Sequence, residues 1–290
     1  MARTVFRTVR KLRRAVPRPF LKWAGGKGQL LPELLAQVET AEPFARYHEP
    51  FVGGGALFFE LARLKRLGRA RAHLSDGNSS LIETYSGLQQ HVDEVIELLR
   101  AHKDQHAEEY YYQVRQMPPD TLAERAARII YLNRTCYNGL YRENSKGQFN
   151  VPFGRYKNPL ICDEPNLRAC AEVLKKAEVE TRHFETVLDR AKPDDFVYFD
   201  PPYHPVSKTA SFTAYAKGGF GEDAQRQLAS VFAELAKKGV KVLLSNSDTD
   251  FVRSLYSGRG FTIQKVLANR SVNSRADRRG PVQEVLVRNF

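Results

Sequence analysis

Four adjacent residues in the second half of the chain could carry out chemistry: Asp200-Pro201-Pro202-Tyr203. They follow Phe196–Phe199, an apolar run typical of a buried strand. The two prolines cannot continue a strand or a helix, so we expect the Asp200 carboxylate and the Pro201 carbonyl to face one point. The Tyr203 ring could stack on a planar base. The alternative is a proline-rich turn that only caps a helix.

Two acceptors at one point suit an amine with two N–H donors. The exocyclic nitrogen of an aminopurine, like that of an amide, is a poor nucleophile because its lone pair is delocalised. Hydrogen bonds to two acceptors would hold this amine and return electron density to its nitrogen. No cysteine follows a proline, so covalent attack on cytosine C5 is not supported.

A glycine-rich turn precedes this motif in the chain, with the sequence Glu49-Pro50-Phe51-Val52-Gly53-Gly54-Gly55. Glycines at a strand-to-helix turn allow the backbone to approach a ligand closely, although a plain tight turn would look the same. Asp76 ends the next predicted strand, roughly twenty residues after Gly53, where an acid binds ribose hydroxyls in nucleoside-binding α/β domains. The glycine spacing disfavours a dinucleotide, and the lack of a Walker-type lysine disfavours a nucleoside triphosphate.

The chain's one tryptophan lies near the N-terminus, in Phe20-Leu21-Lys22-Trp23-Ala24-Gly25-Gly26-Lys27. A lone tryptophan is most often a core residue. The paired glycines and Lys27 favour a second interpretation, in which this stretch surrounds a small ligand.

A polar stretch in the middle of the chain mixes arginines, amides and tyrosines around a glycine. It runs from Asn133 to Arg142 and continues at residues 150–154. Arginine can reach a guanine edge or a phosphate, asparagine can pair with a base edge, and tyrosine can wedge or stack. A polar loop with satisfied side chains is the alternative. For the arginine-containing segment Asn269–Gly280, a solvated loop and a phosphate-contacting loop are equally supported.

These motifs need a scaffold, and the spacing of apolar residues predicts six buried strands. Helical patterns lie between them, as in Ala56–Leu67 before Gly68 and Glu222–Lys238 before Gly239. Strands alternating with helices indicate a mostly parallel, doubly wound α/β sheet. The predicted strands are Tyr47–Phe51, Ala72–Asp76, Phe196–Asp200, Val240–Asn246, Phe261–Leu267 and Val282–Arg288.

The segment from Tyr85 to Leu174 has a different pattern, which is mostly helical and polar. Val92–Lys103 and Leu122–Tyr131 have helical spacing, and Glu143–Tyr156 is typical of a β-hairpin that turns at Lys146-Gly147. We therefore predict a module inserted at residues 85–174, within an α/β domain formed by residues 19–84 and 175–290.

Residues 1–18 are rich in arginine and contain no acid, and they lack the apolar stretch of a secretory signal. We favour a flexible basic arm that adds phosphate contacts. An organellar transit peptide is the less favoured alternative.

The composition favours a polyanion as partner, because the formal net charge is +12. Charge alone does not separate DNA from RNA or from anionic lipid. Three cysteines without metal-type spacing argue against a disulfide framework or a zinc site. The histidines show no metal spacing, and no apolar run is long enough to cross a membrane. We therefore expect a cytoplasmic protein without a metal or a membrane partner, and since no obligate protein partner is evident, a monomer.

From Phe20 to near the C-terminus, the chain resembles the alpha-class, Dam-type (D12) DNA adenine-N6 methyltransferases. The order of the motifs, with an insert before the Asp200–Tyr203 motif, is that of the alpha class. The stretch with Trp23 resembles an N-terminal cofactor motif, Glu49–Gly55 the glycine motif, and Ser75–Asn78 the motif with the ribose acid. Gly77 departs from the larger residue of many relatives, which should leave the role of Asp76 intact.

The resemblance implies a Rossmann-like fold, S-adenosylmethionine as methyl donor and double-stranded DNA as substrate. A prokaryotic or phage-infected cell is implied only by this family resemblance. It implies direct transfer to N6 of a flipped-out adenine at Asp200, Pro201, Pro202 and Tyr203. The implied cofactor residues are Trp23, Lys27, Glu49, Phe51, Gly53, Gly55, Asp76 and Asp200. The implied DNA-binding residues are Arg134, Tyr137, Asn138, Leu140, Arg142 and Pro152.

The same resemblance implies GATC as the recognition sequence. From the residues alone, Arg142 is interpreted as a free guanidinium that could bind guanine, and Leu140 and Pro152 as apolar contacts for a thymine methyl. Three rival hypotheses remain: an RNA adenine methyltransferase, a protein glutamine methyltransferase, and a catalytically inactive DNA-binding module. An asparagine usually occupies the position of Asp200 in the second. A partner nuclease, as in restriction-modification, and a solitary role are both open.

Overall fold

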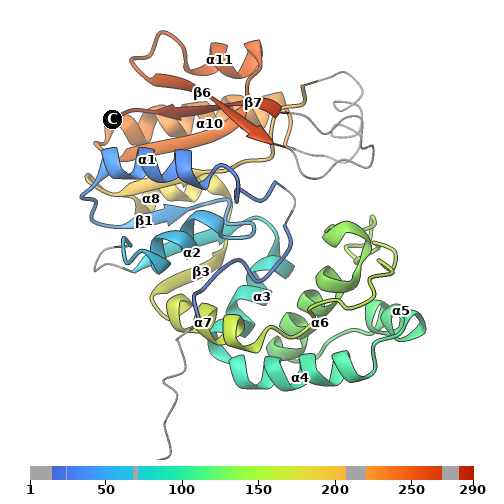
Figure 1. Ribbon diagram of the computed structural model, residues 1–290. Coiled ribbons are helices and arrows are strands. Elements are labelled where there is room, and N and C mark those ends of the chain that lie inside the picture. The colour runs from blue at the N-terminus through green and yellow to red at the C-terminus, as the bar shows by residue number, and fades with distance from the viewer. Residues whose placement is uncertain (1–14, 24, 68–70, 207–219, 270–280) are drawn as a thin grey trace, which may run out of the picture.

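A seven-stranded sheet forms the centre of the computed structural model, which describes residues 15–23, 25–67, 71–206, 220–269 and 281–290 (Figure 1). The strand order is β3-β2-β1-β4-β5-β7-β6. Neighbouring strands from β3 to β5 are parallel, and β7 runs antiparallel between β5 and β6. The predicted mostly parallel, Rossmann-like sheet is confirmed. The strands are β1 Tyr47–Glu49, β2 Ala72–Asp76, β3 Ala177–Thr181, β4 Phe196–Phe199, β5 Lys241–Ser247, β6 Thr262–Asn269 and β7 Pro281–Arg288.

Helices cover both faces of the sheet, so the doubly wound arrangement is also confirmed. Side chains alternate along each strand. Phe196 and Tyr198 of β4 therefore join the core under one set of helices, and Val197 and Phe199 join the core under the other. The first set is α1 Leu31–Ala41, α2 Ala56–Arg63, α3 Ser79–Gln90 and α7 Glu164–Leu174. The second is α8 Val187–Arg190, α10 Glu222–Lys237 and α11 Asp250–Tyr256, with the short 3-10 turn η2 Phe184–Thr186.

Three further helices lie beside the sheet, at the lower right of Figure 1. They are α4 Val92–Asp104, α5 Glu108–Gln116 and α6 Leu122–Thr135, and the 3-10 turn η1 Tyr137–Gly139 follows. A capping box starts α6, in which Thr121 and Glu124 each accept a backbone N–H of the other. Buried residues of α6, such as Ile130, belong to the same hydrophobic cluster as Phe196 of the sheet. The helical segment and the sheet therefore share one continuous core.

The predicted hairpin-like stretch at Glu143–Tyr156 forms a short antiparallel reversal, in which the Asn150 N–H donates to the Arg142 carbonyl at 2.9 Å and the Asn144 N–H to the Gln148 carbonyl at 2.9 Å. The chain reverses where expected, with Gly147 at a φ of 72°. Among the described residues of this stretch, isolated bridges replace regular strands, and one of them joins Glu143 to Phe149. The Asn144 side chain accepts the N–H groups of residues 146 and 148, at 2.9 and 3.0 Å, so it takes donors that a ladder would use.

Several element boundaries differ from the prediction for local reasons. β1 ends at Glu49, since Pro50 has no N–H to continue a ladder. α2 ends at Arg63 because Lys65 adopts a left-handed φ of 60°. α1, α11 and β3 were not predicted. The charged residues Glu178 and Glu180 in β3 hide the apolar pattern of a strand.

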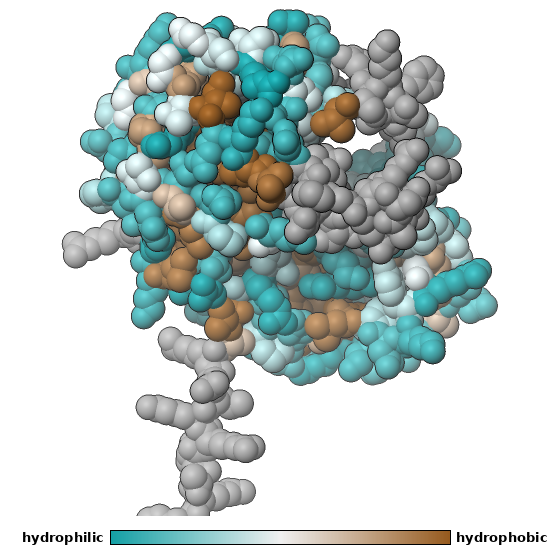
Figure 2. Space-filling view, turned by 45° about the horizontal axis from the view of Figure 1, so that its top comes forward, coloured by the Kyte–Doolittle hydropathy of each residue, from teal (hydrophilic) through white to brown (hydrophobic). Residues whose placement is uncertain are grey.

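The surface shows hydrophobic side chains in several separate patches among hydrophilic ones on the face drawn in Figure 2. Among the described helices, none has the length and apolar character needed to cross a membrane. The predicted basic arm lies largely outside the described residues, as does most of Asn269–Gly280.

Candidate active site and DNA interface

The motifs come together because β1, β2 and β4 are parallel, so their carboxyl ends meet at one edge of the sheet. At this edge the Lys27 ammonium lies 2.7 Å from Oδ1 of Asp200. The same ammonium donates to the Gly25 carbonyl at 2.6 Å and lies 4.6 Å from the centre of the Tyr203 ring. Lys27 is 8% exposed, so it places a buried positive charge between the N-terminal motif and the catalytic motif.

Asp200 and Tyr203 are also held from neighbouring strands. The Ser245 hydroxyl of β5 donates to Oδ1 of Asp200 at 2.9 Å and lies 2.9 Å from the Tyr198 hydroxyl. The Tyr203 hydroxyl donates to Oε2 of Glu284 on β7 at 3.0 Å. The acid and the ring of the motif therefore have defined positions.

Burial shapes the acid–base properties of this edge. It raises the pKa of Asp200, while the Lys27 ammonium and the Ser245 hydroxyl act in the opposite direction. Burial also raises the pKa of Glu49 to about 8, against the hydrogen bond from the Tyr47 hydroxyl. Burial therefore favours the protonated form of both carboxyl groups, and at Asp200 the Lys27 ammonium opposes this effect.

The glycine turn is bound to the acid at the end of β2. The Gly53 N–H donates to Oδ2 of Asp76 at 3.2 Å, and the Asn78 N–H donates to Oδ1 at 3.0 Å. Gly53 and Gly55 have φ values of 46° and 66°, which side chains rarely adopt. A Cβ at Gly53 would lie 2.9 Å from Cδ1 of Trp23, so the turn needs glycine for close packing as well.

Aromatic rings line the two sides of this turn. The partly buried Trp23 ring packs 5.1 Å from the Tyr141 ring, between their centres. On the other side, the Phe51 ring stacks at 5.3 Å on Phe184 and meets Phe220 edge-on at 5.5 Å. The structure thus brings together the predicted cofactor residues of the N-terminal motif, the glycine turn, Asp76 and Asp200.

A buried asparagine ties the N-terminal motif to the polar loop after α6. The Asn133 side chain accepts the Lys22 N–H at 2.7 Å and donates to the carbonyls of Lys22 and Gly139, at 2.7 and 3.1 Å. Gly139 has a φ of 62°, and a Cβ there would lie 2.6 Å from Cδ of Lys22. The loop is therefore anchored beside Trp23.

The predicted DNA-binding side chains of this loop point outward. Tyr137 is 48% exposed and Leu140 is 37% exposed. Asn138 and Pro152 are exposed as well, and the Tyr137 N–H donates to the Pro152 carbonyl at 2.8 Å. The loop and the following turn thus present one joined, solvent-facing surface.

Both arginines that were predicted to bind DNA form hydrogen bonds within the protein. Arg142 is exposed but not free, because its Nε donates to Oδ1 of Asn150 at 2.6 Å and its Nη2 to the Asn150 carbonyl at 3.1 Å. Arg134 is partly buried, and its Nη2 donates to the Phe20 carbonyl at 2.7 Å. Arg134 therefore holds the N-terminal segment, and a DNA contact from it stays a prediction.

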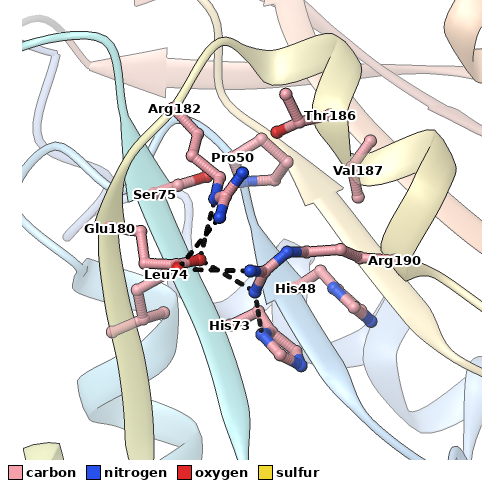
Figure 3. A pocket seen from close by; sticks show the side chains of 10 residues that line it. All are labelled: His48, Pro50, His73, Leu74, Ser75, Glu180, Arg182, Thr186, Val187 and Arg190. Atoms are coloured by element: carbon pink, nitrogen blue, oxygen red, sulfur yellow. Dashed lines mark hydrogen bonds and ion pairs between the residues drawn. The ribbon is translucent and has the colours of Figure 1, made fainter.

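A small pocket lies between the sheet and α8, and its lining includes Pro50 and Ser75, which adjoin Glu49 and Asp76 in the chain (Figure 3). The His48 and His73 rings stack there with centres 4.8 Å apart, and His48 pairs with the buried Asp195 at 2.9 Å. Arg190 bonds His73 at 3.1 Å and Glu180 at 3.2 Å. Because the charged groups are paired with one another, the pocket is a structural ion-pair cluster. In the described parts of the chain, no group of histidine, cysteine and acidic residues could hold a metal ion.

Comparison with known proteins identifies the family. The sequence profile of the D12 class N6 adenine-specific DNA methyltransferases matches residues 23–272. The chain belongs to this family. It is 43% identical to the type II methyltransferase M1.LlaDCHI of Lactococcus lactis subsp. cremoris, over 94% of this chain and 95% of that protein. It is 37% identical to the DNA adenine methylase of Escherichia coli K12, over 93% of this chain and 94% of that protein.

The family membership confirms the predicted activity. The protein is a DNA adenine methyltransferase, and the RNA and protein glutamine alternatives are set aside. The methyl donor of this class of enzyme is S-adenosylmethionine, and the substrate is DNA.

Sequence reasoning missed several residues that complete the site of this methyltransferase. They are Gln225, Ser245, Asn246 and Glu284, all of them buried, and the anchoring role of Asn133 was also not foreseen, although this residue begins the predicted polar stretch. A signal was present for two of them, because Ser245 and Asn246 interrupt an otherwise apolar strand. Such polar residues are buried only where they find hydrogen-bond partners.

Proposed function

We propose that this methyltransferase transfers the methyl group at Asp200–Tyr203, to N6 of an adenine rotated out of duplex DNA. The observation that carries the proposal is the buried Lys27–Asp200 pair at the carboxyl edge of the sheet, 2.7 Å apart. It places a carboxylate beside a tyrosine ring and next to the glycine turn. Asp200→Ala, described below, tests this assignment.

The residues at this edge fit S-adenosylmethionine by their charges and shapes. The buried Lys27 ammonium suits the carboxylate of the amino-acid part, and the Asp76 carboxylate suits the ribose hydroxyls. Glycines with positive φ at positions 53 and 55 keep the turn free of side chains. We assign Trp23, Glu49 and Phe51 to the walls of the same site. When bound, the cofactor supplies a methyl group on a positively charged sulfur.

The protein's part in the reaction is to hold and polarise the amine. The closest contacts of Lys27 and Ser245 are both to Oδ1 of Asp200, so we assign Oδ2 to one N–H of the target adenine. The Pro201 carbonyl accepts the other N–H, and the Tyr203 ring stacks on the base. These fixed acceptors favour the state in which positive charge develops on N6. With S-adenosylmethionine bound, N6 would gain the methyl group that the cofactor supplies and would lose one N–H proton to solvent.

Flipping of the adenine is assigned to the loop after α6. Tyr137 and Asn138 are exposed there, and Asn138 has a left-handed φ of 55°. A ring and an amide at this tip could enter the gap that the flipped base leaves. A 2-aminopurine at the target position should brighten when the wild-type protein binds. Tyr137→Ala should brighten it less, and equal brightening would exclude the tyrosine as the wedge.

We propose GATC as the recognition sequence, read by Tyr137, Asn138, Leu140, Arg142 and Pro152. Support comes from the match of these positions to the Dam-type loop and from their exposure on one surface. The test is expression in cells free of adenine methylation, followed by single-molecule mapping of N6-methyladenine. Methylation at GATC is the expected result. Methylation confined to another motif would overturn the proposed sequence and leave the enzyme class standing.

Residues 85–174 are accordingly proposed as the target-recognition module, within a catalytic domain of residues 19–84 and 175–290. A monomeric state and a cytoplasmic location stay predictions. The name of the Lactococcus relative, a type II methyltransferase, favours a restriction-modification role, while the name of the Escherichia relative leaves a solitary role open.

A further inference from the structure

A chain of two buried amides connects the catalytic turn to the centre of the protein. Nε2 of Gln225, on α10, donates to the Pro202 carbonyl at 2.9 Å. Nδ2 of Asn246, on β5, donates to Oε1 of Gln225 at 3.0 Å. Oδ1 of Asn246 in turn accepts the N–H groups of His204 and Ser247, at 3.0 and 2.8 Å. Gln225 and Asn246 are fully buried.

The direction of this chain is set by the backbone at both ends. The Pro202 carbonyl can only accept, so Gln225 must present its NH₂ group there and its oxygen to Asn246. The N–H groups of His204 and Ser247 can only donate, so Asn246 must present its oxygen to them. If the oxygen and the NH₂ group of either amide were exchanged, two donors would face each other on one side of it and two acceptors on the other. The pair therefore has one arrangement.

The amide pair binds the backbone on both sides of Tyr203. The peptide carbonyl before Tyr203 and the N–H after it both end on the amide pair. The Pro202 ring fixes its own φ, so the anchored Pro202 carbonyl also limits the peptide that contains the Pro201 carbonyl. Two of the three groups assigned to the target adenine, the ring and the second acceptor, thus depend on the pair for their direction.

We propose that Gln225 and Asn246 are positioning residues for methyl transfer, which orient the Tyr203 ring and the Pro201 carbonyl. The proposal rests on the proposed catalytic role of the Asp200–Tyr203 turn. Among the described residues, the hydrogen bonds of the pair lead to Pro202, His204 and Ser247, and none leads to Asp200 or to a residue assigned to the cofactor. Loss of the pair should therefore slow the chemical step and leave binding of cofactor and DNA nearly unchanged.

The test compares Gln225→Met with Gln227→Met. Gln227 lies two positions along α10, is exposed, and bonds Glu185 instead of the turn. With saturating cofactor and DNA, the single-turnover rate of Gln225→Met should fall by about tenfold to a hundredfold, as misplacement of reacting groups does. Dissociation constants for both ligands should change less than twofold, and Gln227→Met should methylate at the wild-type rate. A wild-type rate for Gln225→Met, or a loss that lies in binding, would overturn the proposal.

Gln225→Glu separates positioning from folding. A protonated carboxyl can donate to the Pro202 carbonyl and accept from Asn246, whereas an ionised one repels that carbonyl. The rate of this variant, divided by the wild-type rate at the same pH, should rise as the pH is lowered. A ratio that does not change with pH, in a variant with a wild-type melting temperature, would contradict the proposal. If Asp200→Ala also kept its activity, the proposed function itself would fail, which is a distinguishable result.

Discussion

The carboxyl edge of the sheet and the loop after α6 hold their functional side chains in different ways. At the edge, Asp200 is bonded by Lys27 and Ser245, and Tyr203 by Glu284. In the loop, the backbone is anchored through Asn133, but the side chains at positions 137, 138 and 140 face solvent.

The difference follows from what each region must meet. Groups that stabilise charge in a reaction act best when they are fixed before the substrate arrives. Groups that read a base edge must instead be exposed, because their partners come from outside. Arg142 is intermediate, since Asn150 orders a guanidinium that is still exposed.

The largest expected effect is on the fixed side of this comparison. Asp200→Ala should remove one acceptor from the target amine and lower the rate by about a hundredfold or more, while DNA binding stays largely intact. Single-turnover methylation measures the rate. Asp250→Ala is the control, because that carboxylate is exposed and pairs with Arg253. A near wild-type rate for Asp200→Ala would refute the assigned role.

Asp76→Ala tests whether the edge is also the cofactor site. A charge-assisted hydrogen bond to ribose contributes roughly 1.5–3 kcal/mol, so affinity for S-adenosylmethionine should fall about tenfold to a hundredfold. Calorimetric titration gives the affinity, and thermal melting shows whether the variant is folded. Asp76→Asn keeps an acceptor for the Gly53 N–H and should lose less affinity for S-adenosylmethionine than Asp76→Ala. Unchanged affinity in a folded Asp76→Ala would move the ribose site elsewhere.

Arg142→Ala tests the exposed side of the comparison. Loss of a bidentate arginine–guanine contact should cost roughly 1–3 kcal/mol and relax the choice of base at one position. Methylation rates on duplexes that vary one base pair at a time measure this. Arg168→Ala, which removes a surface arginine paired with Glu164 and Asp93, is the control. Uniform weakening on all sequences would identify Arg142 as a phosphate contact instead.

The smallest expected effect is a shift in pH dependence. Burial raises the pKa of Asp200, and Lys27 counteracts this. The ionised form is the acceptor, so the rate should fall as the pH is lowered. The midpoint of this fall should lie at a higher pH than the pKa of an ordinary aspartate. Lys27→Met removes the counteracting charge and should move the fall to still higher pH, measured at saturating cofactor. A midpoint unchanged by this substitution would show that Lys27 does not tune Asp200.

Local sequence patterns were sufficient for the motifs and for most strands. The Asp200–Tyr203 turn is dictated by two prolines after an apolar run, and Glu49–Gly55 by glycines between a strand and a helix. β3 escaped prediction because its apolar residues are few, and α11 because it is only seven residues long. In the stretch Glu143–Tyr156 the chain reverses at the predicted Lys146-Gly147 turn, but the pairing is limited to isolated bridges because the Asn144 side chain competes for backbone donors.

The sequence by itself determined which groups are available for the reaction and where the chain must turn, because these depend on neighbours along the backbone. Only the tertiary structure decided which groups meet. Asn133 binds Lys22 from 111 positions away, and Ser245 binds Asp200 from 45 positions away. Gln225 and Asn246 carry no local sign of their partners. Such contacts form where the sheet brings distant segments to one edge, and burial makes the unpaired alternatives costly.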